Sequence, residues 1–232
     1  MQPFLPVRPW TGQRLPLSEV LLRNVIVAAA YFVTGMAGLK LAFVGDVVTL
    51  FWPPSGIAFA ALWMGGRWLL IGVIAGAFAV NLVQMEQWPF AALVALGNAL
   101  PALVATTILR SRIKQRTRGR RELGELSRVL QFIMIAALGS TTLSATVGTL
   151  AVAAAGPVTG PVSSAWLVWW MGDAMGVLIV APPILLWERY LKQRPRLRDV
   201  ADAAAFAFAG IGIIFGLLLI RNPIWAVELC KL

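Results

Sequence analysis

Histidine is absent from the 232 residues, and there is one cysteine, Cys230. Without imidazole the chain cannot ligate haem or a metal through histidine, use an imidazole general base or accept a phosphoryl group on histidine. A single cysteine excludes an intrachain disulfide and argues against a thiolate metal cluster. We also find no phosphate-binding loop, zinc-protease pair or nucleophile elbow. We therefore expect no metal, no cofactor and no enzymatic activity in this chain.

Charge is also scarce. Charged residues make up 13% of the chain, whereas soluble domains carry about 25%. Hydrophobic residues make up 59%, and the mean hydropathy is +0.79. The net charge is +10, but no nucleic-acid-binding fold accompanies it, so we expect no nucleic acid partner. The composition is typical of a protein embedded in a lipid bilayer, in which basic residues set the orientation.

Charge-free stretches near the roughly 20 residues needed to cross a membrane occur seven times. They predict an all-α fold, a polytopic transmembrane helix bundle of about seven spans. The predicted spans are 24–39, 47–66, 68–85, 87–109, 129 to about 154, about 164 to 187, and 203–220.

The two arginine-rich loops, 110–128 and 189–198, orient the bundle. Both fall on the cytoplasmic side only if the N-terminus is cytoplasmic, as the positive-inside rule requires. The chain then divides into a cytoplasmic segment 1–22, a transmembrane domain 23–220 and a short outside tail 221–232. Such a tail suggests that the chain is truncated before a further span.

Asp173 is the clearest anomaly in the predicted spans. If its helix begins near Ser164, Asp173 lies about 14 Å deep at 1.5 Å per residue. A carboxylate near the midplane costs roughly 2.5–3.5 kcal/mol, so it must be protonated, paired or hydrated. Asp173 could serve as a proton, cation or ligand site, or as a neutral carboxyl that ties two helices together.

A second anomaly is the sequence Trp52-Pro53-Pro54-Ser55. The 13 residues from Pro54 to Gly66 make about 20 Å of helix, which is too short to cross a membrane alone. Either the helix begins before the prolines and is kinked, or an extended segment descends into the membrane. Broken helices often mark binding sites in membrane proteins, whereas prolines also commonly just begin a helix.

Counting residues from the predicted span ends places Ser55, Asn98, Ser144 and Asp173 at similar depths. They could form one polar layer in the outer half of the bundle, in which the Asn98 amide or the Ser144 hydroxyl donates to Asp173. Small residues four apart also predict close helix packing; examples are the pairs Gly72/Gly76 and Gly172/Gly176 and the series Ser140/Ser144/Gly148.

Several motifs occur in the order found in one family of bacterial membrane domains. They are Phe51–Ala58, Gly65–Trp68, Gly76–Asn81, Gly97–Leu100 and Trp169–Leu178. The chain resembles MASE1, a membrane-associated sensor domain, from about Ala28 to Leu186. The resemblance implies an input domain in the bacterial inner membrane. Members usually precede histidine kinase, diguanylate cyclase or phosphodiesterase modules.

The anomalies and motifs together give a set of candidate ligand-binding or sensing residues. They are Asp173, Asn98, Trp52, Pro53, Pro54, Ser55, Ser144, Trp169, Trp170 and Asn81.

We therefore predict a sensory input domain of a two-component or cyclic-di-GMP system. It would pass an unknown small-molecule or ion stimulus, through helix repacking, to a cytoplasmic signalling module on the same chain or a partner. A homodimer is a candidate assembly. The alternative is a small transporter or channel subunit that uses the polar layer around Asp173. A third interpretation is a non-catalytic scaffold that places a partner at the membrane.

Overall fold

Helices make up nearly all of the described part of the chain. The computed structural model describes residues 16–39, 42–44, 48–85, 87–118, 125–156 and 161–192. In chain order the elements are α1 (Leu17–Leu39), β1 (Ala42–Val44), β2 (Val48–Thr49), α2 (Pro53–Gly65), a 3₁₀ turn (Arg67–Leu69), α3 (Leu70–Met85), α4 (Trp88–Arg118), α5 (Glu125–Gln131), a π-helical segment (Phe132–Gly139), α6 (Thr141–Ala155) and α7 (Val162–Lys192).

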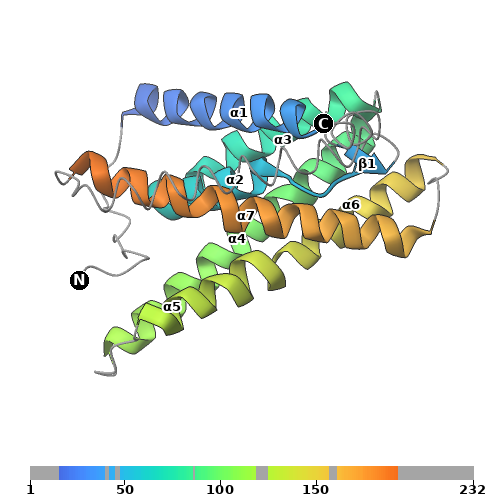
Figure 1. Cartoon of the computed structure of the whole chain (residues 1–232). Helices are drawn as coiled ribbons and strands as arrows, with labels where there is room; N and C mark the ends of the chain where they lie inside the picture. The colour runs from blue at the N-terminus through green and yellow to red at the C-terminus, as the bar shows by residue number, and fades with distance from the viewer. Residues whose placement is uncertain are drawn as a thin grey trace, which may run out of the picture.

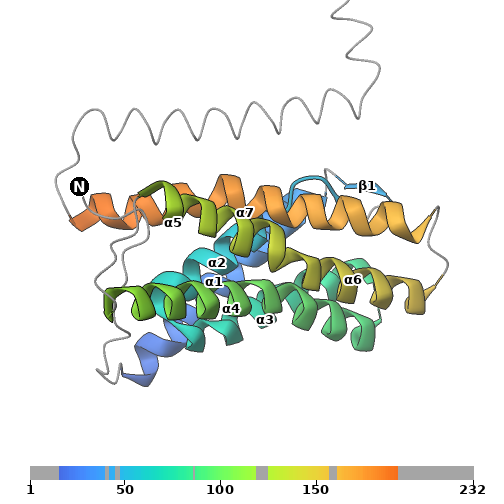
Figure 2. The same cartoon turned by 90° about the horizontal axis from the view of Figure 1, so that it is seen from below.

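The helices run along one common direction and alternate in sense, so that both ends of the bundle are built from several connections (Figures 1 and 2). One end carries the antiparallel pair β1–β2, the last residues of α6 and the first residues of α7; we call it the hairpin end. The other, the basic end, carries the described arginines of the helix termini: Arg23, Arg67, Arg110, Arg112 and Arg128. Helix α2 lies at the centre, in contact with α1, α4 and α7.

Five helical stretches in the described residues are long and apolar enough to cross a membrane: Leu17–Leu39, Arg67–Met85, Trp88–Ile113, Leu126–Ala155 and Val162–Trp187. An all-helical membrane bundle is thus confirmed, with five candidate spans. Inside a bilayer there is no water to bond the backbone, so a spanning segment must pair its N–H and C=O groups internally. This requirement explains why these apolar stretches are helical. The predicted span 203–220 and the segments 1–15 and 221–232 lie outside the described residues.

The predicted span 47–66 is not one long helix. Helix α2 begins at Pro53 and has 13 residues, because the prolines occupy its first two positions and cannot continue a helix on their N-terminal side. The residues before it, Val48–Trp52, are not helical. Of the two alternatives, the structure therefore has a non-helical segment that leads into α2, not a kinked helix; we call Val48–Trp52 the descending segment. About 16 Å of extended chain and about 20 Å of helix together match a bilayer core of about 30 Å.

Glycines allow the descending segment and α2 to lie directly against α7. A Cβ at Gly172 would meet the carbonyl oxygen of Thr49, and a Cβ at Gly176 would meet the carbonyl oxygen of Trp52. Gly56 of α2 in turn faces the backbone at Gly176. The close packing predicted from the Gly172/Gly176 spacing is confirmed, since only glycine leaves room for a backbone at this distance.

The outward surface of the bundle is apolar. On α1, Leu21, Val25, Ile26 and Val33 are each more than half exposed. A soluble monomer rarely exposes such a continuous apolar face, so these side chains are placed for contact with lipid.

Candidate functional site

Asp173 lies in the interior of the bundle, eleven residues after α7 begins at Val162. Its side chain is 1% exposed. The Ser55 hydroxyl, in the first turn of α2, donates to Asp173 Oδ1. The other oxygen, Oδ2, is buried and makes no hydrogen bond with any described residue. No described cationic side chain pairs with this acid either.

Ser144 connects three helices beside this acid. Its hydroxyl donates to Asn98 Oδ1 of α4 at 2.9 Å, and its oxygen accepts the indole N–H of Trp169 of α7 at 3.2 Å. Ser144 also lies within interaction range of the Asp173 carboxyl. All of these side chains are less than a tenth exposed, so α4, α6 and α7 are joined by polar contacts deep within an apolar bundle.

Tyr31 of α1 belongs to the same group, although sequence analysis missed it. It is fully buried, and its hydroxyl accepts the indole N–H of Trp52 at 3.4 Å. The phenol also interacts with Asn98 and lies near Asp173. The available signal was a phenol midway along the predicted span 24–39. A tyrosine at this depth is unusual, since tyrosine is enriched at membrane interfaces. We call the whole set the polar cluster: Tyr31, Trp52, Ser55, Asn98, Ser144, Trp169 and Asp173.

Four other candidate residues lie outside the polar cluster. The Trp170 indole donates to the backbone oxygen of Leu138 at 2.9 Å. Asn81, on α3, donates to the Ala77 oxygen of its own helix at 2.7 Å. Pro53 and Pro54 begin α2 and act through the helix they start. The structure thus brings together six of the sequence candidates, and their part in sensing stays a prediction.

The start of α2 also has an electrostatic effect at Asp173. A helix N-terminus carries the positive end of the helix dipole, which stabilises negative charge within about one turn. Because Ser55 is in that first turn and contacts Asp173, the acid lies within range of this dipole. Burial away from water disfavours the carboxylate, whereas the α2 terminus and the neighbouring donors favour it.

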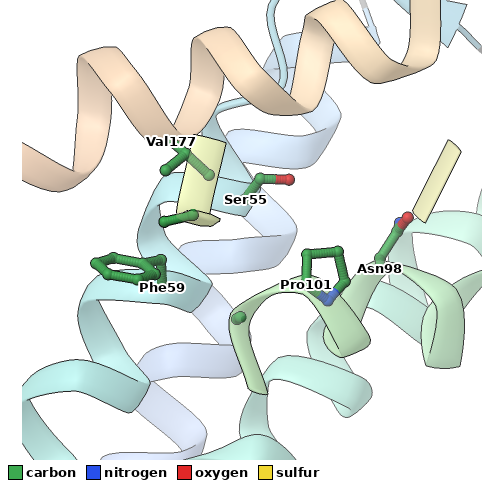
Figure 3. Close-up of a pocket in the computed structure, with 7 residues that line it drawn as sticks. Ser55, Phe59, Asn98, Pro101 and Val177 are labelled. Carbon is green, nitrogen blue, oxygen red and sulfur yellow. The ribbon is translucent and has the colours of Figure 1, made fainter. Parts of the chain in front are cut away.

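A narrow void adjoins the polar cluster on the side of the basic end (Figure 3). Its empty volume is about 200 Å³, but it leaves no space for a water-sized sphere. Ser55 and Asn98 form its polar side, and Phe59 and Val177 lie across from them (Figure 3). Pro101, which interrupts the hydrogen bonding of α4, also lines it, as do Ala102 and Ala136.

The two directions leading away from the polar cluster differ in chemistry. Toward the basic end, Phe59 continues into a buried apolar cluster that includes Trp63, Leu109 and Phe132. Toward the hairpin end, hydroxyl groups follow: Thr49 and Thr149 are buried there. The Thr149 hydroxyl finds no partner in the described part of the chain. Buried hydroxyls also lie toward the basic end, at Thr106, Ser140 and Thr141, but each donates to a backbone oxygen one turn earlier. Apolar side chains pack on the hairpin side as well. The two sides therefore differ in the unpartnered Thr149 hydroxyl, not in polarity as such.

Comparison with protein-family models matches residues 23–230 to MASE1. The matched range contains every residue of the polar cluster and extends beyond the segment 28–186 that carries the sequence motifs. No curated protein and no solved structure matches the chain.

Proposed function

Because the chain belongs to MASE1, a family of membrane sensor domains, we propose that it is the sensory input domain of a bacterial signalling protein in the inner membrane. It passes a stimulus to a cytoplasmic kinase or cyclic-di-GMP module, on a continuation of the chain or on a partner. The observation that carries this proposal is the polar cluster. It joins α1, α2, α4, α6 and α7 through buried polar contacts.

The polar cluster suits a sensor because a change at one member alters contacts of several helices. A stimulus acts only by favouring one of two conformations, so it must change interactions that differ between them. Hydrogen bonds in an apolar interior meet this condition, since a donor or acceptor left without a partner costs about 1–3 kcal/mol. Helix α7 carries Asp173 inside the bundle and continues to Lys192 at the basic end. It is the natural path for the signal.

We propose that the basic end faces the cytoplasm, with the N-terminus inside and seven spans in total. The gathering of arginines at that end supports this orientation. Counting α2 with its descending segment, the described residues provide six passes, and the predicted span 203–220 provides the seventh.

Cysteine labelling tests the orientation. In a C230S background, Ser111→Cys places one thiol at the basic end and Gly156→Cys one at the hairpin end, and both positions are exposed. A membrane-impermeant maleimide applied to intact spheroplasts should label only Gly156→Cys, and Ser111→Cys should react after permeabilisation. The reverse pattern would contradict the proposed topology.

A reporter fusion tests the signalling role. We would place the full chain, followed by one added transmembrane helix that returns the polypeptide to the cytoplasm, ahead of a diguanylate cyclase reporter. Cyclic-di-GMP would be measured in cells for the parent, Asp173→Asn and the matched control Glu19→Gln. Glu19 is a surface acid paired with Arg23. At equal membrane levels, Asp173→Asn should change the output at least twofold, and Glu19→Gln should not. Unchanged output with Asp173→Asn would remove Asp173 from the mechanism.

The transporter or channel alternative ranks second. A solute path must open to water at some point, and the void beside the polar cluster admits no water-sized sphere. Reconstituted liposomes distinguish the two functions. A membrane that stays impermeable under imposed ion and solute gradients favours the sensor, and specific flux favours the transporter.

A further inference from the structure

The hydrogen-bond inventory of the polar cluster leaves one oxygen without a partner. Ser55 donates to Asp173 Oδ1, Ser144 donates to Asn98 Oδ1, and the two indoles donate to Ser144 and Tyr31. Among the side-chain polar atoms of the polar cluster, only Asp173 Oδ2 is buried and without a hydrogen bond to a described residue. In an apolar interior a bare carboxylate oxygen is costly, so a ligand that satisfies this atom would be stabilised there.

Ser144 decides which ligand fits. A serine hydroxyl has one proton to donate, and Ser144 gives it to Asn98 at 2.9 Å. Toward the nearby Asp173 carboxyl, Ser144 can therefore only accept. A proton on Asp173 Oδ2 supplies the missing donor, neutralises the acid and needs no additional volume. Ca²⁺ or Mg²⁺ would need about six or more oxygen ligands, whereas the described residues contain no group of three or more acidic, histidine or cysteine side chains that could hold a metal ion.

Loss of that proton would force a rearrangement. Ionised Asp173 would face the lone pairs of Ser144, so the Ser144 hydroxyl would turn and donate to the carboxylate instead. Asn98 would then lose its donor. The contact that ties α6 to α4 would be replaced by one that ties α6 to α7, and the protonation state of one group would select between two packings of the same helices.

Both protonation states are within reach at this position. Burial favours the neutral acid, and the N-terminus of α2 together with the Ser55 hydroxyl favours the carboxylate. Among the described residues, the only other titratable group that faces Asp173 is the phenol of Tyr31, on α1. The side chains presented by α2, α4 and α6 are Ser55, Asn98 and Ser144, which do not titrate.

We propose that the polar cluster is a proton-binding site, with the proton held on Asp173 Oδ2, and that it exchanges protons with the hairpin end of the bundle. The direction follows from Thr149, whose buried hydroxyl on that side has no partner among the described residues, whereas the buried hydroxyls on the other side donate to their own backbone. Resting on the proposed sensor function, this inference identifies the stimulus as the proton concentration at the hairpin end.

Infrared difference spectroscopy tests the site. We would titrate the purified full chain in lipid nanodiscs and follow the carbonyl stretch of a protonated carboxylic acid in an apolar environment, which lies at higher frequency than that of water-exposed acids. The parent should show a band at low pH that disappears reversibly as the pH rises. Asp173→Asn should lack it, and Glu19→Gln should retain it. A band that is unchanged at every pH would mean that Asp173 is always protonated and only connects helices. Absence of the band at every pH would mean that Asp173 is always ionised. Either result overturns the proposal.

Two further arms complete the experiment. Ser144→Ala should shift the band, because the acid loses a polar neighbour. This variant also replaces Asp173→Asn if the latter does not fold. An unshifted band overturns the proposal. At fixed pH, replacing choline chloride with sodium chloride should leave the band unchanged. Loss of the band in sodium would identify a metal cation as the occupant and refute proton binding.

The stimulus is tested separately in the reporter fusion. Output should follow external pH in the parent and become independent of it in Asp173→Asn. Output that responds to other conditions but not to pH would overturn the proton as stimulus while leaving the sensor function intact. A fusion with no regulated output under any condition would instead count against the sensor function.

Discussion

The contact between α7 and the descending segment can be tested by a single methyl group. In Gly176→Ala, the added Cβ would meet the backbone of Trp52, with its carbonyl carbon 2.7 Å away and its carbonyl oxygen closer still; the Pro53 nitrogen lies at 3.5 Å. Both close atoms belong to the main chain, so no side-chain rotation can relieve the overlap. The descending segment and α2 must move away from α7 as a unit.

The expected cost follows from this overlap. Inserting a methylene-sized group into a well-packed interior costs about 1–3 kcal/mol, and a backbone neighbour places Gly176→Ala in the upper part of that range. For a chain of this size, 1 kcal/mol shifts Tm by about 2–4 °C. We therefore expect Tm to fall by roughly 6–12 °C. The same displacement draws Ser55 away from Asp173, because both are fixed by this contact.

Thermal unfolding in nanodiscs, followed by tryptophan fluorescence, measures the effect. Gly156→Ala is the matched control, since a Cβ there meets nothing within 4 Å and the extended backbone at this residue suits any side chain. Its Tm should stay within about 2 °C of the parent. If Gly176→Ala melts with the control, α7 does not hold the descending segment at this distance, and the proposed geometry of the site is wrong.

Two further substitutions probe other contacts by the same assay. Ser144→Ala should lower the free energy of unfolding by about 1–3 kcal/mol, because it leaves two buried partners without a hydrogen bond. Ser111→Ala, at an exposed hydroxyl, should change it by less than about 0.5 kcal/mol. Equal effects of the two substitutions would contradict the hydrogen bonds of the polar cluster. Arg110 stacks over the Trp63 ring, 4.9 Å from its centroid, and donates to the Trp63 oxygen. Arg110→Gln should therefore lower the free energy of unfolding by about 0.5–2 kcal/mol. The control Arg112→Gln, at an exposed arginine, should lower it less. A larger loss in Arg112→Gln than in Arg110→Gln would refute the stacking argument.

The sequence predicts those features that depend only on position along a helix. Span positions follow from apolar length. Residue counting placed Ser55, Asn98, Ser144 and Asp173 at a common depth, and the structure joins Ser55 to Asp173 and Ser144 to Asn98 by hydrogen bonds. Depth along a helix is a product of residue number and rise, so it can be read from a sequence without knowledge of neighbours.

The parts that were not predicted depend on rotation about the helix axis. Trp169 and Trp170 are adjacent in sequence, yet the first donates into the polar cluster and the second to the backbone at Leu138. Nothing in the local sequence separates them, because neighbouring residues on a helix differ in direction by about 100° and the packing partner decides which one faces inward. Tyr31 was missed for the same reason: its role depends on Trp52 and Asn98, which lie on other helices.

The depth of Asp173 makes the membrane potential a second influence on this residue. Eleven residues of α7 separate it from Val162, or about 16 Å, close to half of a 30 Å hydrocarbon core. A full membrane crossing by one charge corresponds to about 2.3 kcal/mol per 100 mV. A proton reaching Asp173 from the hairpin end would therefore gain about 1.2 kcal/mol per 100 mV. If the hairpin end is outside, an inside-negative voltage favours protonation of Asp173. Asp173 would then be protonated at outside proton concentrations that leave it ionised in a depolarised membrane. The domain would respond to the proton gradient and the voltage together, that is, to the proton-motive force.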